Sequence, residues 1–120
     1  MAWIAWTLVA VVALLHILFM AAEMFAWEKM ARRVVEPSVA RATKALGANQ
    51  GLYNGFLAAG LLWSLRSPPA VDTELAVFFL GFVVVAGIFG ALTILPINYR
   101  LLVLQSLPAL CALLALWMVG

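Results

Sequence analysis

Charged residues are scarce in this 120-residue chain, and their scarcity argues against a soluble domain. Asp, Glu, Lys and Arg together make up 10% of the sequence, while 68% of its residues are hydrophobic. The mean hydropathy is +1.14. A soluble domain is usually about half apolar and about a quarter charged. The composition therefore indicates a membrane protein, and the length predicts a single domain.

Histidine and cysteine are nearly absent, with one residue of each. Cys111 cannot form a disulfide within the chain, and a single histidine, His16, excludes a bis-histidine site within one chain. The sequence also lacks a metal-ligand cluster, a phosphate-binding loop and a nucleophile–base pair. We predict no metal site, and the net charge of +2 gives little support for a nucleic-acid partner. The sequence does not name a cofactor.

The first apolar run lacks the basic residues that precede the core of a signal peptide. It starts at once with MAWIAW and continues to about residue 27, whereas a signal core has about 7–15 residues. We therefore expect this segment to be a retained membrane span.

Long hydrophobic runs are abundant, and a run of about 20 residues can cross a bilayer as a helix. The chain has four such runs, at about residues 3–27, 48–65, 75–96 and 101–118. Pro37 is placed to begin a helix within the first connection. The predicted fold class is all-α, an integral membrane four-helix bundle that occupies residues 1–120 as one four-span domain.

Basic residues mark one side of this bundle. Six of them lie in the 28–47 segment or just before the last span, namely Lys29, Arg32, Arg33, Arg41, Lys44 and Arg100. The opposite side has only Arg66. Because cytoplasmic connections carry the excess of Lys and Arg, we expect the 28–47 segment in the cytoplasm and both termini on the outer side.

Polar residues within the spans gather in the cytoplasmic half. They are Glu23, the amides and tyrosine of residues 49–54, Thr93, Gln105 and Ser106. Such groups are costly in lipid and usually face the protein interior or a water-filled cavity. We expect a cavity there, with the Glu23 carboxyl hydrogen-bonded to at least one of the amides or to Tyr53.

The helical period groups these candidates into faces. His16, Glu23 and Trp27 share one stripe of the first span, and four polar residues share one face of the second. Gly51, Gly55 and Ala59 form the opposite face, which suits close helix contact and predicts a homo-oligomer. The predicted ligand-binding residues are His16, Glu23, Trp27, Asn49, Gln50, Tyr53, Asn54 and Gln105. In this scheme Glu23 carries the charge or proton, the amides and Tyr53 orient the ligand, and His16 closes the apolar end.

Two stretches, HILFMAAEMFAW (16–27) and ANQGLYNGFLAAGL (48–61), resemble a known family. They are similar to the small bacterial membrane proteins of domain of unknown function 1304, and the likeness extends over essentially the whole chain. It implies four spans and a multi-pass protein of the bacterial cytoplasmic (inner) membrane. It implies no activity, since the family is named for lacking one.

RATKALGANQGLYN (41–54) bears a fainter resemblance to the membrane-associated eicosanoid and glutathione metabolism proteins. These are four-helix trimers that bind glutathione between protomers near the cytoplasmic side. The likeness would make Arg41 an anion-binding residue and Tyr53 the group that activates the thiol. The acidic residue that this family has one turn later is missing here.

Several functions remain open from the sequence. We favour binding of a small polar or amphipathic molecule in a cytoplasm-facing intramembrane cavity. The alternatives are a glutathione-transferase-like enzyme, a transporter or channel subunit with a proton path through His16 and Glu23, and a purely structural polar layer. The expected partners are the lipid bilayer, further copies of the chain (a trimer is one option) and a small-molecule ligand.

The charge asymmetry makes a prediction about topology. Cysteines introduced into the 28–47 segment should be shielded from an impermeant thiol reagent in intact cells, whereas cysteines at either terminus should be labelled. Labelling of the 28–47 segment from outside would reverse the orientation.

Overall fold

The regular elements of the chain are all helices in the computed structural model, which describes residues 1–93 and 99–120. Four helical segments are long: α1 (Ala2–Phe25), α4 (Lys44–Ser64), α5 (Asp72–Thr93) and the run of α6 (Tyr99–Leu101), η1 (Leu102–Ser106) and α7 (Leu107–Trp117). Two short helices, α2 (Trp27–Ala31) and α3 (Pro37–Ala42), connect α1 to α4. The predicted all-helical class is confirmed, and Pro37 begins α3 as expected.

Three of the described helical segments are long and apolar enough to cross a membrane, namely Ala2–Phe25, Asp72–Thr93 and Tyr99–Trp117. The predicted span at 48–65 is also a helix, α4, but it does not belong to this set. Its first half carries Lys44 and the polar side chains of residues 49–54, which lower its hydropathy. The last residues of the predicted third span (94–96) and most of the 96–100 connection lie outside the described residues.

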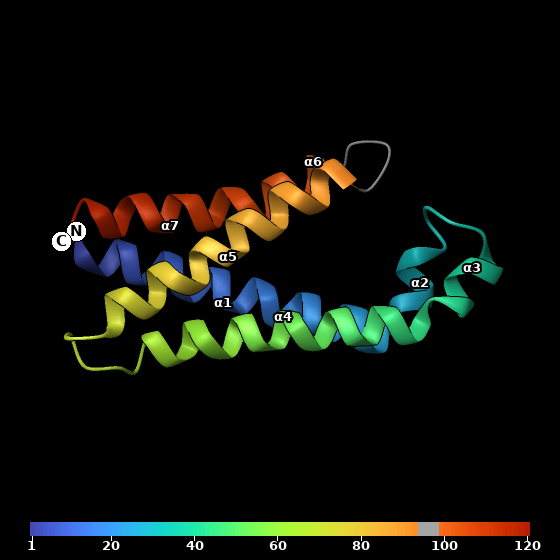
Figure 1. Ribbon diagram of the computed structural model, residues 1–120, viewed down its shortest axis with the longest axis horizontal. Coiled ribbons are helices and arrows are strands. Elements are labelled where there is room, and N and C mark those ends of the chain that lie inside the picture. The colour runs from blue at the N-terminus through green and yellow to red at the C-terminus, as the bar shows by residue number, and fades with distance from the viewer. Residues whose placement is uncertain (94–98) are drawn as a thin grey trace.

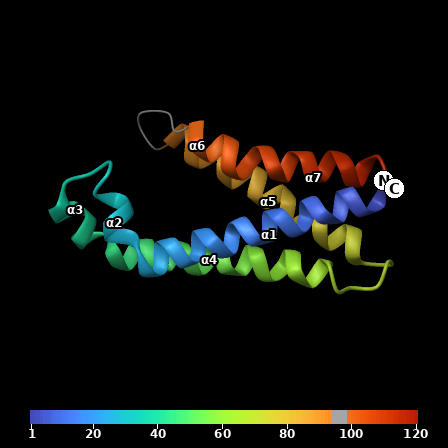
Figure 2. The same ribbon diagram turned by 180° about the vertical axis from the view of Figure 1, so that it is seen from behind.

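The long helical segments form two pairs, α1 with α4 and α5 with the run of α6, η1 and α7 (Figures 1 and 2). Both chain termini lie at one end of the molecule, which we call the terminal end. The short helices α2, α3 and α6 lie at the opposite end, which we call the basic end because six of the seven Lys and Arg residues belong to it. The pairs lie close together at the terminal end and separate toward the basic end (Figure 1).

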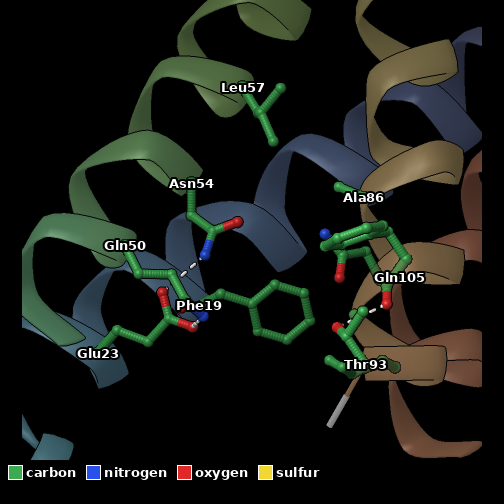
Figure 3. A pocket seen from close by; sticks show the side chains of 11 residues that line it. Phe19, Glu23, Gln50, Asn54, Leu57, Ala86, Thr93 and Gln105 are labelled. Atoms are coloured by element: carbon green, nitrogen blue, oxygen red, sulfur yellow. Dashed lines mark hydrogen bonds between the residues drawn. The ribbon is translucent and has the colours of Figure 1, made fainter. Parts of the chain in front are cut away.

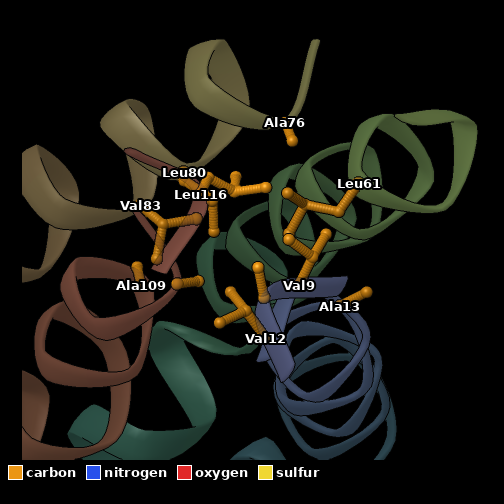
Figure 4. Packing of buried hydrophobic residues seen from close by; sticks show 11 residues of the cluster. Val9, Val12, Ala13, Leu61, Ala76, Leu80, Val83, Ala109 and Leu116 are labelled. Atoms are coloured by element: carbon orange, nitrogen blue, oxygen red, sulfur yellow. The ribbon is translucent and has the colours of Figure 1, made fainter. Parts of the chain in front are cut away.

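The buried apolar core occupies the terminal half, where α1, α4, α5 and α7 meet (Figure 4). Five of its eleven residues are alanine, which lets the helix backbones approach closely. Its members are Ala5, Val9, Val12, Ala13, Leu61, Ala76, Leu80, Val83, Ala109, Ala112 and Leu116. The outer surface is also apolar, with exposed Phe, Leu, Val and Trp side chains on all four long segments. An apolar interior under an apolar surface is the arrangement that a lipid environment requires.

Trp27 attaches the short helices to the start of α4. The chain departs from helical geometry at Ala26 (φ −129°, ψ 19°), so that Trp27 begins a new helix. Its Nε1–H donates to Thr43 Oγ1 at 3.1 Å, and its ring lies against the backbone of Gly47. A Cβ at position 47 would overlap the ring, so this contact needs glycine.

A pair of glycine substitutions tests the Trp27 contact. Gly47→Ala should lower the free energy of unfolding by about 1–3 kcal/mol, because the added methyl must displace the indole. Gly81→Ala is the matched control: a Cβ there has no neighbour within 4 Å, and alanine favours a helix over glycine by about 0.5–1 kcal/mol. Thermal unfolding of the detergent-solubilised variants measures both. Equal effects of the two substitutions would show that the indole contact contributes nothing.

Candidate functional site

A pocket of about 470 Å³ lies where the two helix pairs separate (Figure 3). Residues from α1 and α4 form one wall, and residues from α5, α6 and η1 form the other. The lining consists of Phe19, Glu23, Gln50, Asn54, Leu57, Ala86, Phe89, Gly90, Thr93, Leu101 and Gln105. Polar groups from α1, α4, α5 and η1 thus share one pocket in the basic half of the molecule.

Glu23 of α1 is bonded to two amides of α4. Gln50 Nε2 donates to Glu23 Oε1 at 3.0 Å, and Asn54 Nδ2 donates to Glu23 Oε2 at 2.7 Å (Figure 3). The two amides are four residues apart and therefore lie one above the other on the same side of α4. The predicted hydrogen bond between Glu23 and an amide of the second span is confirmed.

Glycine allows α1 and α4 to come close enough for these bonds. A Cβ on Gly51 would lie 2.7 Å from Met24 Cγ and 3.0 Å from the carbonyl oxygen of Met20. A Cβ on Gly55 would lie 2.6 Å from the sulfur of Met20. Gly51 and Gly55 therefore pack against α1 of the same chain, whereas Ala59 is exposed. The prediction that the glycines face away from the amides was wrong, since Gln50 and Asn54 also contact α1. The two glycines are used inside the protomer, so they give no separate support to an oligomer.

The opposite wall carries Thr93 and Gln105. Thr93 lines the pocket, and its Oγ1 donates to the carbonyl oxygen of Phe89 at 2.8 Å. Gln105 belongs to the π-helical turn η1, a geometry that is frequent at functional sites. Ser106 fixes this turn on α5, because its Oγ donates to the carbonyl oxygen of Val84 at 3.1 Å. No hydrogen bond joins the Gln105 amide to another described residue, so both its donor and its acceptor are open to a ligand.

Among the described lining residues, Glu23 has the only titratable side chain. An ionised carboxyl group has about four acceptor positions, and the two amides use two of them. The carboxyl can therefore accept further N–H or O–H donors from a bound molecule. Phe19, Leu57, Phe89 and Leu101 supply apolar contact beside it. Among residues 1–93 and 99–120 no group of three or more His, Cys, Asp or Glu side chains could hold a metal ion.

His16 lies behind the pocket lining. It is fully buried, its Nδ1 is 2.8 Å from the carbonyl oxygen of Val12, and its Nε2 has no hydrogen-bond partner among the described residues. Its ring packs edge-on against Phe19, with the centroids 5.4 Å apart. Phe19 is the residue that lines the pocket. We predicted that His16 closes the apolar end of the cavity. In the structure His16 does not line the pocket and contacts it only through the Phe19 ring.

The structure places four other predicted site residues outside the pocket. Asn49, Tyr53 and Arg41 are exposed on the protein surface, and Trp27 packs on Gly47. Asn49 and Tyr53 lie about 100° around α4 from Gln50 and Asn54, so only the latter two face Glu23. The polar face predicted from helical spacing included all four residues, and spacing alone could not separate Gln50 and Asn54 from Asn49 and Tyr53.

Sequence reasoning missed the apolar part of the lining. Phe19, Leu57, Ala86, Phe89, Gly90 and Leu101 line the pocket, but they do not differ from the residues around them in a hydrophobic span. Thr93 did carry a signal, since its depth matched that of the other polar residues. Gln105 is part of the lining, and its role in ligand binding stays a prediction.

These features define an all-helical protein whose apolar helices are those of a membrane protein of unknown activity. The chain matches the family described as protein of unknown function (DUF1304) over residues 10–117, and it belongs to that family. Comparisons with curated proteins and with solved structures each found no match. Membership of this family assigns no activity to the chain, so we argue the function from the residues of the pocket.

The Glu23 site predicts unequal effects of two similar substitutions. Asn54→Leu should lower the free energy of unfolding by about 1–3 kcal/mol, because the side chain is only 9% exposed and the hydrogen bond reaches a charged group. Gln50→Leu should cost less, since Gln50 is exposed and water can replace its bond. Chemical unfolding in mild detergent measures both. A larger loss for Gln50→Leu than for Asn54→Leu would contradict the arrangement.

Proposed function

We propose that this protein binds a small amphipathic molecule whose polar end carries an ammonium or another hydrogen-bond donor. The observation that carries the proposal is the Glu23 carboxyl, held by Gln50 and Asn54 in a pocket whose other described lining side chains are neutral. A cation placed there would meet a charge of opposite sign in a region of low dielectric. The apolar part of the molecule would lie against Phe19 and Leu57 or against Phe89 and Leu101 of the other wall.

The same proposal places the pocket on the cytoplasmic side of a four-span bundle. The α4 helix has 21 residues, which is enough to cross the hydrocarbon core. Its polar first half is directed partly into the pocket rather than entirely into lipid. The basic end holds six of the seven Lys and Arg residues, and positive charge accumulates on the cytoplasmic side. Both termini would then lie on the outer side. The bacterial inner membrane is proposed from the family likeness.

A homo-oligomer is part of the proposal, but its support now comes from another surface. Asn49 and Tyr53 are exposed on the outward side of α4, and Tyr53 is 61% exposed. Polar groups that face lipid are costly, and a second copy packed on this face would cover them. Native mass measurement of the protein in nanodiscs reads the number of copies directly.

The other functions need features that one protomer does not bring together. A glutathione site built on Arg41 and Tyr53 would have to lie between protomers, because both residues are on the outer surface. A proton path from Glu23 to His16 would require Phe19 to move aside. A purely structural polar layer is the outcome if the pocket binds nothing.

Three short amphiphiles of equal chain length test the ligand chemistry. We expect the purified protein to bind hexylammonium more tightly than hexanol, and hexanol more tightly than hexanoate, by ligand-detected NMR. Glu23→Gln should weaken hexylammonium binding by about tenfold or more, since a hydrogen bond to a charged group contributes about 1.5–3 kcal/mol. Glu36→Gln is the matched control, because Glu36 is exposed at the same end and outside the pocket.

The result that contradicts the proposal is equal binding of the three amphiphiles, or an equal effect of Glu23→Gln and Glu36→Gln. If a Glu23→Leu, Gln50→Leu, Asn54→Leu triple variant also folds as well as the parent, the polar layer has no binding role and no structural requirement either.

A further inference from the structure

A second hollow lies at the opposite end of the molecule, in the angle between the end of α4 and the start of α5. It is a groove of about 470 Å³ lined by Trp63, Val71, Glu74, Leu75 and Phe78. The two helices are joined here by a short connection near the chain termini (Figure 1). The groove shares no residue with the pocket around Glu23.

Packing between α4 and α5 fixes the aromatic part of this groove. The Phe79 ring lies against the backbone of Gly60, where a Cβ would overlap it. Phe78 packs edge-on against Phe79, with centroids 5.4 Å apart, and against Phe82, with centroids 4.7 Å apart. Its ring is therefore held from two sides while the side chain remains 57% exposed. Trp63 follows Gly60 by three residues, so it lies on the same side of α4.

The connection fixes the remaining wall. The N–H groups of Val71 and Asp72 both donate to the carbonyl oxygen of Pro68, at 3.0 and 3.1 Å, and close a tight turn beside the groove. Glu74 stands in the first turn of α5 and forms no ion pair with another described residue. The groove thus combines two exposed aromatic rings with an unpaired carboxylate and contains no basic residue.

We propose that this groove binds the ammonium head group of a phospholipid. Ammonium groups are attracted to the faces of Trp and Phe rings, and aromatic cages are the usual recognition site for choline-like cations. A carboxylate beside the rings adds the attraction of opposite charges. The groove lies at the N-terminal end of α5, a helix that is long and apolar enough to cross a membrane. If α5 spans the bilayer, the groove lies at the level of the membrane surface. Tryptophan also favours this interfacial position. Arg66 is exposed in the connection that follows α4, three residues after Trp63, where its charge would be available to the lipid phosphate.

The occupant is therefore a zwitterionic lipid, with ethanolamine or choline as its head group, and not an anionic one. A phosphatidylglycerol head group offers hydroxyls in place of the cation, and its net negative charge would meet Glu74. This site is independent of the proposed ligand pocket, since it depends on different residues at the other end of the molecule.

Lipid retention in mixed nanodiscs tests the proposal. The protein is reconstituted in equal amounts of phosphatidylethanolamine and phosphatidylglycerol with identical acyl chains, and native mass spectrometry counts the lipids that stay bound. Wild-type protein should retain phosphatidylethanolamine preferentially. Glu74→Gln and Trp63→Leu should each reduce the ratio of the two retained lipids by about three- to five-fold, the range expected for one such cation contact. Leucine keeps an apolar side chain at position 63, and circular dichroism checks that each variant is folded.

Two control variants separate this site from general effects. Trp117→Leu removes another exposed tryptophan at the terminal end, and Glu36→Gln removes an exposed carboxyl at the basic end. Both should leave the ratio unchanged. Phosphatidylcholine retained with the same dependence on Glu74 and Trp63 would also support the proposal. It is overturned if Glu74→Gln and Trp63→Leu have no effect, if a control variant lowers the ratio as much, or if phosphatidylglycerol is retained instead.

Discussion

A carboxyl group on an apolar membrane helix has to find donors within the protein, and this constraint organises half of the structure. Glu23 finds them on α4, where Gln50 and Asn54 donate to its two oxygens. The requirement explains why α4 is less apolar than the other long helices. It also explains the glycines at 51 and 55, because the bonds form only if α1 and α4 lie close together.

The molecule has two ends with different packing. At the terminal end, small side chains such as Ala5, Ala76 and Ala112 let all four long helices meet in one core. At the basic end the two helix pairs separate, and the pocket occupies the space between them. The closely packed end holds the four helices together, and the open end leaves room for the pocket between them. The π-helical turn at η1 adds Gln105 to the open end without interrupting the last helix.

The pocket around Glu23 and the groove around Glu74 each have one carboxylate in their lining. The outer surface of the basic end is positive, but the described lining of its pocket contains Glu23 and no Lys or Arg. The groove at the terminal end likewise contains Glu74 and no basic residue. Under the two proposals both would favour cationic head groups, one in the polar layer and the other at the membrane surface. The first would select a small molecule, whereas the second would select a lipid in contact with the protein.

The sequence by itself determined the helical class, the positions of the long helices and the polar layer that includes Glu23, Gln50, Asn54 and Gln105. These features follow from hydropathy, helical period and depth, which are properties of neighbouring residues along the chain. Only the tertiary structure decided that Gln50 and Asn54 face Glu23 while Asn49 and Tyr53 face outward. Helical spacing gives a residue's angle relative to its own helix, but the rotation of that helix against its neighbours depends on packing. The sequence also could not identify Phe19 and Phe89 as lining residues, because an apolar residue that lines a pocket looks the same in sequence as one that faces lipid.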